Sequence, residues 1–302
     1  MAAPSLLDDL REKARRAGFR RFWRSPSEPT NFRARDASPS AVRADVEYGL
    51  ICGRSYLASL RKHGIEPDGI AVVEIGPGVA FGGMAYLAAF GTGVTVADRW
   101  LAPWQDDYHR AYYAALGEAV GGEAPYASRI GALASGGGYR DGPITMVHAA
   151  AEHLHNSHDC AFDAVFSNAV LEHVYDLDAT AASLFRATKP GGMGFHQVDF
   201  RDHRDFDRPL EHLLYNAHAW EKLSSRVHWE YGTQRRPDEY RASFISSGFL
   251  MVDYHVSESA DPAYIDGLIP RLRSSRRSRY RDVETSALSE LGGHFTLRCP
   301  IV

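Results

Sequence analysis

The residue pattern with the clearest chemical meaning is a short turn, Glu74-Ile-Gly-Pro-Gly78, which follows an apolar run and opens a helix-like segment. Glycines let the backbone turn tightly and approach a ligand, and the free N–H groups at a helix start bind polar or anionic atoms. Asp98 ends the next apolar run, about 20 residues further on, where a carboxylate can accept hydrogen bonds from both ribose hydroxyls. The pattern predicts a site for an adenosine-containing ligand, with a tight turn that binds nothing as the structural alternative.

Nicotinamide dinucleotides and S-adenosylmethionine both satisfy that geometry, and later motifs distinguish them. In order along the chain these motifs are Ala151-Glu-His-Leu154, Phe162-Asp-Ala-Val-Phe-Ser-Asn168, Leu171-Glu-His173 and Lys189-Pro-Gly-Gly192. Together with the turn and Asp98, residues 70–200 resemble the class I S-adenosylmethionine-dependent methyltransferases, in particular their small-molecule, type 11-like branch. Several ordered motifs are far more specific than one glycine turn.

The resemblance implies where S-adenosylmethionine binds. The turn would contact the methionine part, Asp98 the ribose, and the segment at Ala151 the adenine. Ala150 stands where relatives often carry an acid for the adenine amino group, so backbone groups at Ala151 and the side chain of Glu152 are expected to hold the adenine instead. The residues implied in donor binding are Glu74, Gly76, Gly78, Asp98, Arg99, Ala151, Glu152 and Asn168.

The implied reaction is transfer of the sulfonium methyl group to a small molecule, preferably to an oxygen, with nitrogen or carbon as alternatives. The donor is already activated, so the protein mainly aligns the reactants and excludes water. A hydroxyl acceptor also needs a base, for which His173 and His203 are the candidates, each with a structural role as its alternative. The candidate substrate-binding residues are Trp100, Trp104, His196, Asp199 and Arg236. Core packing or ion pairing is the alternative role for these side chains.

No metal site is predicted. Ala169 occupies what looks like one ligand position of relatives that bind a metal near the Leu-Glu-His segment. A mixed set of carboxylates and imidazoles could suit several divalent ions, but its spacing matches no known motif. That set is Asp199, Asp202, His203 and His212.

Positioning these residues requires strands and helices in alternation. Apolar runs predict strands at residues 71–75, 94–97, 144–147, 162–166 and 193–198, and late, mutually antiparallel strands at 249–256 and 294–302. Helices are expected at residues 42–63, 82–90 and 177–188. This order predicts an α/β, Rossmann-like class I methyltransferase sheet, mostly parallel with an antiparallel C-terminal strand and with helices on both faces.

Two insertions, residues 99–143 and 200–247, follow the C-terminal ends of strands. Ligands bind at that edge of open α/β sheets, so we expect the insertions to form the walls and lid of a substrate pocket. Residues 1–64, which include a basic amphipathic helix over 5–24, are expected to form a helical cap. Residues 65–302 are the expected methyltransferase domain.

Composition favours small-molecule chemistry. The 302 residues carry 34 Lys plus Arg against 38 Asp plus Glu, which disfavours a nucleic-acid-binding surface over the whole protein. Three scattered cysteines form no CxxC pair, and no stretch approaches the ~18 apolar residues of a membrane span. We therefore expect a cytoplasmic enzyme with a small-molecule substrate and no nucleic-acid or membrane partner, for which a homodimer is one option.

Three rival functions remain open. An RNA or protein methyltransferase is suggested by the arginine-rich residues 271–281. An NAD-dependent oxidoreductase shares the turn and Asp98 but gives Leu171-Glu-His173 and Lys189-Pro-Gly-Gly192 no role. A catalytically silent protein that binds S-adenosylmethionine is suggested by Ala150.

Overall fold

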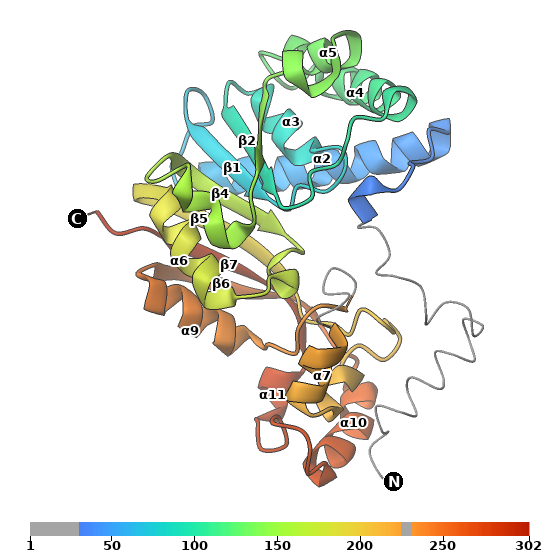
Figure 1. Cartoon of the computed structure of the whole chain (residues 1–302), viewed down its shortest axis with the longest axis vertical. Helices are drawn as coiled ribbons and strands as arrows, with labels where there is room; N and C mark the ends of the chain where they lie inside the picture. The colour runs from blue at the N-terminus through green and yellow to red at the C-terminus, as the bar shows by residue number, and fades with distance from the viewer. Residues whose placement is uncertain (1–29, 225–230, 302) are drawn as a thin grey trace.

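A seven-stranded sheet forms the centre of the protein, as the computed structural model of residues 30–224 and 231–301 shows (Figure 1). Its spatial order is β3-β2-β1-β4-β5-β7-β6. The strands are β1 (Ala71–Ile75), β2 (Gly93–Asp98), β3 (Ile144–His148), β4 (Phe162–Asn168), β5 (Thr188–Asp199), β6 (Leu250–Ser259) and β7 (Glu290–Arg298). Strands β1 to β5 pair in parallel, whereas β7 is antiparallel to both β5 and β6. The predicted mostly parallel sheet with an antiparallel C-terminal strand is confirmed.

Helices surround the sheet. They are η1 (Thr30–Phe32), α2 (Pro39–Lys62), α3 (Gly82–Ala88), α4 (Asp106–Val120), α5 (Ser128–Ser135), η2 (Gly138–Asp141), η3 (Ala151–Asn156), η4 (Leu171–His173), α6 (Leu177–Ala187), η5 (Glu211–Leu214), α7 (Ala217–Ser224), α9 (Pro237–Ser247), α10 (Pro262–Ser274) and α11 (Thr285–Leu288). Within the described ranges, none of them has the length and apolar character needed to cross a membrane. The helix expected at residues 5–24 lies outside the described residues.

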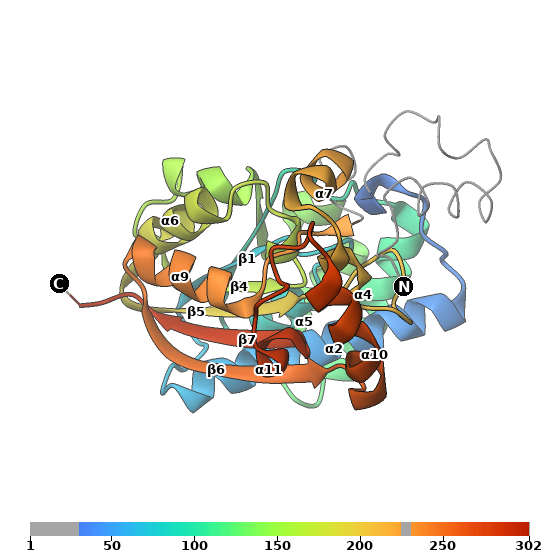
Figure 2. The same ribbon diagram turned by 90° about the horizontal axis from the view of Figure 1, so that it is seen from below.

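Alternation along the strands builds two separate cores. In β1, Val72 belongs to the core shared with α2, α3 and α4, while Val73 and Ile75 belong to the core shared with α6 and α9. Successive side chains of a strand point to opposite faces, so one short apolar strand serves both layers. Figure 2 shows α6 and α9 on the same side of the sheet.

Helix α2 packs unusually closely on α3 because glycines face the contact. A Cβ built on Gly53 would lie 2.4 Å from Cβ of Tyr86, and one built on Gly49 would lie 3.2 Å from Cα of Gly82. The two glycines are four residues apart, so they share one face of α2. The sequence pattern predicted a helix here but gave it only the role of a cap; it forms part of the layer that covers the sheet.

Residues 99–143 are mainly a crossover. They carry α4 and α5 and return the chain to β3, which is parallel to β2. Parallel neighbours need such a connection, and α4 buries Tyr112, Tyr113 and Leu116 in the core of that face. Only part of this expected insertion can therefore line a pocket.

A small helical unit stands at the C-terminal edge of the sheet. Its core joins η5 to α10 and α11 through Leu213, Leu268 and Leu288. Figure 1 shows α7, α10 and α11 together at one end of the molecule. Residues 260–289, between β6 and β7, supply half of this unit, and the sequence pattern did not predict that contribution.

Replacing Gly53 with alanine should destabilise the protein, because the new methyl group would meet Tyr86 at the α2–α3 contact. We expect a loss of about 1–3 kcal/mol in the free energy of unfolding, measured by urea denaturation. The control is Gly131→Ala in α5, where an added Cβ meets nothing within 4 Å. That change should be neutral or stabilise by about 0.5–1 kcal/mol. Equal stability of the two variants would contradict the close-packing argument.

Candidate active site

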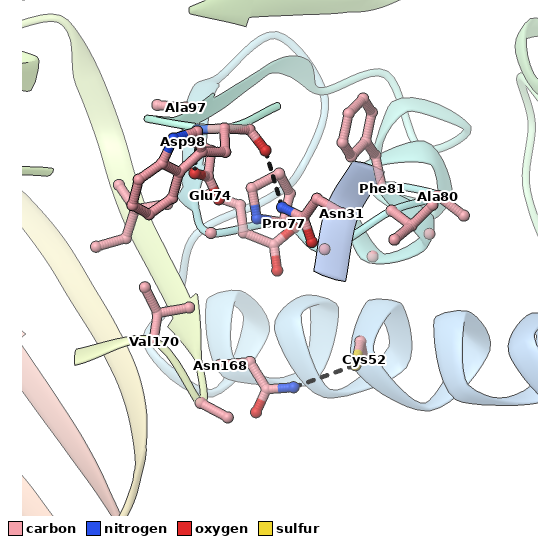
Figure 3. Close-up of a pocket in the computed structure, with 18 of the residues that line it drawn as sticks. Asn31, Cys52, Glu74, Pro77, Ala80, Phe81, Ala97, Asp98, Asn168 and Val170 are labelled. Carbon is pink, nitrogen blue, oxygen red and sulfur yellow. Dashed lines mark hydrogen bonds between the residues drawn. The ribbon is translucent and has the colours of Figure 1, made fainter. Parts of the chain in front are cut away.

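A pocket of about 460 Å³ opens at the C-terminal ends of β1, β2 and β4. The glycine turn, the end of β2 and the loop after β4 form its inner wall, and η1, α2 and α4 supply the outer wall. Figure 3 shows Glu74 and Asp98 on one side of this space, with Cys52 and Asn168 on the other. Every residue that the sequence implied in donor binding lines this pocket.

Left-handed backbone explains why the turn after β1 contains glycines. Gly76 has φ 62° and Gly78 has φ 73°, a conformation that side chains with a Cβ rarely adopt. A Cβ on Gly76 would also lie 2.4 Å from a methyl group of Val170 in the loop after β4. The turn is held in place because the Gly76 N–H donates to the carbonyl of Ala97, 2.9 Å away.

Glu74 presents a buried carboxyl group to this pocket. Its side chain is buried, the hydroxyl of Tyr56 donates to Oε1, and Oε2 has no hydrogen-bond partner among the described residues. Burial raises the pKa of Glu74 from 4.5 to about 7, against the smaller lowering by Tyr56. A cation that bound beside this group would favour its ionised form.

Asp98 is the acid at the tip of β2. Its Oδ1 accepts the backbone N–H of Trp100 over 2.7 Å. Burial raises the pKa of Asp98, and this hydrogen bond opposes the shift. The arrangement fixes the carboxyl group at the pocket, where it can accept hydrogen bonds from paired hydroxyls.

Arg99 and Glu152 form a second polar wall. Arg99 Nη2 lies 3.5 Å from Glu152 Oε2, and its guanidinium lies 4.8 Å from the ring centre of Tyr175. The backbone N–H of Tyr175 also donates to Glu152 over 3.3 Å. A planar ligand group can bind against Tyr175, which the sequence analysis did not single out.

Helix α2 contributes pocket residues that the sequence analysis missed. Asn168 donates to the hydroxyl of Tyr48 over 2.7 Å and to Sγ of Cys52 over 3.5 Å. Burial raises the pKa of Cys52 to about 11 and also raises the pKa of Tyr48, so both side chains stay protonated at neutral pH. The spacing of Tyr48, Cys52 and Tyr56 places them on one helical face, and this was the available signal.

His173 lies in the pocket wall, on η4 after β4. Its ring centre lies 4.9 Å from that of His203, which follows β5 and does not itself line the pocket. His173 Nε2 also lies 3.9 Å from Oε1 of Glu172, which is buried. Catalytic roles for His173 and His203 stay predictions.

Two aromatic residues predicted to bind the substrate lie outside this pocket, and their rings pack against the core. Trp104 stacks on His109 and Tyr113 instead of lining the pocket. His196 is buried, stacks on Phe244 and shares a 2.8 Å hydrogen bond with Ser167. Burial lowers the pKa of His196 to about 3, so it stays neutral.

Two charged residues that were predicted to bind the substrate, Asp199 and Arg236, also lie outside the pocket. Asp199 is held by Arg201 through contacts of 2.6–3.1 Å. Arg236 begins α9 and donates to the carbonyls of Phe200, Leu288 and Glu290, which ties α9 to the β6–β7 connection. Neither side chain lines the pocket, whereas the remaining substrate candidate, Trp100, does.

Comparison with a family described as Methyltransferase domain gives a match over residues 124–195. The matched stretch runs from before α5 into β5 and contains Glu152, Asn168 and His173. The matched stretch begins after the glycine turn and Asp98 and therefore includes neither. No curated protein matches the chain.

Solved structures offer distant likenesses. One is a protein from Galdieria sulphuraria proposed to be a sarcosine dimethylglycine methyltransferase, with 14% identity, 86% of this chain and 87% of that chain covered, and a TM-score of 0.47. Another is an S-adenosylmethionine-dependent methyltransferase from Mesorhizobium loti, with 17% identity, coverage of 80% and 96%, and a TM-score of 0.45. The Haemonchus contortus phosphoethanolamine N-methyltransferase 2 has 19% identity and a TM-score of 0.44, covering 82% of this chain and 52% of that one.

Likenesses this distant carry no information about the substrate of this chain. The family match and the strand order rest on independent observations, one from the sequence and the other from the hydrogen-bonded sheet. The match covers less than half of the chain, and the strand order agrees with the mostly parallel methyltransferase-like sheet that the sequence predicted.

Proposed function

We propose that this protein transfers a methyl group from S-adenosylmethionine to an oxygen of a small molecule. The observation that supports the proposal most directly is the single pocket that joins the glycine turn, Asp98, Glu152 and His173. These residues come from three strand ends and the segment after β3. A pocket of this size is in the ordinary range for a nucleoside-sized ligand.

The pocket offers side chains with suitable chemistry for each part of the donor. Asp98 can accept the ribose hydroxyls, and Arg99, Glu152 and Tyr175 offer a polar and aromatic wall for the adenine. The methionine ammonium would supply the cation that buried Glu74 lacks. The donor itself supplies an activated methyl group, which leaves sulfur as the acceptor oxygen bonds to the carbon.

The chain must then hold the acceptor and remove its proton. The electron pair of the acceptor oxygen forms the new bond to carbon while the carbon–sulfur pair returns to sulfur. His173 is the candidate to take the acceptor proton, because it lies in the pocket wall and an imidazole changes charge near neutral pH.

The outer wall supports a small acceptor. Asn31 of η1 donates to the carbonyl of Trp100 over 2.9 Å, and the backbone N–H of Arg35 donates to Gln105 over 2.8 Å. Gln105 in turn donates to the carbonyl of Arg33 over 3.0 Å. These bonds hold the segment before α2 against the segment after β2, and Asn31, Arg35 and Trp100 of these segments line the pocket.

The rival functions fit the structure less well. In the arginine-rich run, Arg271 pairs with Glu211 over 2.6 Å and Arg279 pairs with Glu239 over 2.9 Å, while Arg273 donates to backbone carbonyls. These internal contacts reduce the charge available to RNA. The insertion of β7 between β5 and β6 departs from the 3-2-1-4-5-6 order of dinucleotide-binding folds.

Replacing Asp98 with alanine should weaken the binding of S-adenosylmethionine and S-adenosylhomocysteine alike. Both ligands carry the same ribose, and hydrogen bonds to a charged group contribute roughly 1.5–3 kcal/mol, so we expect a loss of about 10- to 100-fold by calorimetry. The control is Asp107→Ala, an exposed residue at the start of α4. Unchanged affinity of the Asp98 variant for both ligands would refute the ribose assignment.

Replacing His173 with alanine should lower turnover much more than donor affinity. General base catalysis contributes roughly 10²- to 10⁴-fold, and we expect a loss in that range once an acceptor has been found with methyl-labelled donor. His153→Ala, at an exposed position in η3, serves as the control. Wild-type turnover at saturating substrates would remove His173 from the reaction.

Replacing Glu74 with glutamine should stabilise the donor-free protein at high pH only. Glu74 titrates near 4.5 in the unfolded chain and near 7 in the folded one, so the folded state binds more protons between these values. The free energy of unfolding of the wild type therefore falls as the pH rises through this window, by up to about 3 kcal/mol.

The test compares melting temperatures at pH 5 and pH 8. The Glu74→Gln variant should match the wild type at pH 5 and exceed it at pH 8. Glu118→Gln, an exposed change in α4, should show no such difference between the two pH values. A gain for Glu74→Gln that is equal at both values would show that the ionised carboxylate is not the cause.

A further inference from the structure

Glu172 is a buried acid beside His173, close to the donor pocket. Its side chain is 2% exposed, and neither carboxylate oxygen has a hydrogen-bond partner among the residues that the structure describes. Buried polar groups are almost always paired, because an unpaired one loses its hydration without compensation. The orphaned pair of oxygens therefore indicates a missing partner.

His203 shows the same deficiency on the neighbouring loop. Its Nε2 is buried and has no hydrogen-bond partner in the described part of the chain. Asp199 Oδ2 lies 3.5 Å away, beyond normal hydrogen-bond length, and is itself held by Arg201 at 2.6 Å. The ring of His203 thus lies beside Glu172 and His173, with Nε2 at ion-pair distance from Asp199 but outside normal hydrogen-bond length.

The three side chains converge on one point. One ligand atom from each of Glu172, His173 and His203 lies within 4.8 Å of the other two. Bonds of ~2.1 Å to a shared ion bring ligand atoms to ~3–4 Å of one another, so small side-chain rotations would complete the site. Of the three residues, His173 lines the donor pocket, and it connects Glu172 and His203 to the pocket wall.

The backbone holds these residues firmly. Glu172 and His173 lie on η4, and the loop leading to it begins at Ala169, whose φ is 53°. The Ala169 N–H donates to the side chain of Gln197 in β5, 2.9 Å away. The loops after the parallel neighbours β4 and β5 are thereby fixed beside each other, and a residue from each reaches the cluster.

We propose that Glu172, His173 and His203 bind one divalent transition-metal ion, of the Zn²⁺, Mn²⁺ or Fe²⁺ class, at the wall of the donor pocket. Two imidazoles and one carboxylate form a ligand set typical of these ions, and Mg²⁺, which prefers oxygen ligands, suits the set poorly. Three protein ligands leave coordination positions open for water or for a ligand in the pocket.

The site would also refine the proposed function, on which this step depends. An acceptor hydroxyl at an open position loses its proton more readily, because the ion stabilises the oxyanion. In that case the acceptor proton would pass to water in the pocket, and the loss of turnover expected for His173→Ala would come from the loss of a metal ligand. The proposal thus points to acceptors with a hydroxyl or enol oxygen that can coordinate a metal.

The experiment uses the full-length chain without a polyhistidine tag, stripped with a chelator and dialysed. Zn²⁺ is titrated by calorimetry and Co²⁺ by visible absorption, both without S-adenosylmethionine. We expect one ion per chain, with affinity at least tenfold lower in Glu172→Gln and in His203→Asn. His153→Asn, which changes an exposed histidine outside the cluster, should bind as the wild type does.

Folding and donor binding are measured separately on each stripped variant. Glu172→Gln preserves the shape of the side chain and replaces a carboxyl group that has no hydrogen-bond partner among the described residues. Its metal-free melting temperature should therefore not fall, which separates a lost ligand from a lost fold. Wild-type affinity in both variants, absence of binding by the folded wild type, or equal binding of Mg²⁺ would each overturn the proposal. Failure of the stripped protein to bind S-adenosylmethionine would instead count against the proposed function and leave the metal result standing.

Discussion

The parallel pairing of β1 with β2 and with β4 is the constraint on which the site depends. Its register places Ile75 beside Ala97 on one side and beside Ser167 on the other. The chain therefore leaves three neighbouring strands at one level, and the glycine turn, Asp98 and Asn168 meet at a common edge. Strand ends are fixed by many backbone hydrogen bonds, so the ligand-binding groups inherit the rigidity of the sheet.

Close packing on both faces turns that edge into an enclosed pocket. Glycines in α2 let it approach α3, and the same helix sends Tyr48 and Cys52 to Asn168 at the end of β4. On the other side of the sheet, Arg236 ties α9 to the β6–β7 connection through backbone carbonyls. These contacts join segments that are far apart in the sequence, and they decide which strand-end residues face the pocket.

The contrast between local sequence patterns and these long-range contacts explains how much of the site could be predicted from the sequence. The strands and the turn were predictable because periodicity, glycine chemistry and the acid after β2 are local properties, and Asp98 and Glu152 do line the pocket. Trp104, His196 and Arg236 were misplaced because an aromatic or charged residue near a strand end can equally fill a core or cap a helix. The proximity of Glu172 to His203 could not be predicted from the sequence, because the two residues lie about 30 positions apart on loops that follow different strands.

Two buried acids then raise a common physical question. Glu74 and Glu172 each have at least one carboxylate oxygen without a partner, and burial raises the pKa of both. Such groups destabilise the ligand-free fold when ionised, so a sequence selected for stability alone would replace them. Glu74 lines the pocket and Glu172 adjoins His173 in its wall, and the two proposals give both acids one explanation: the donor ammonium binds at Glu74 and a metal ion at Glu172. Binding would then be strengthened by the same desolvation that weakens the free protein, since a charge pair is worth more where water is excluded.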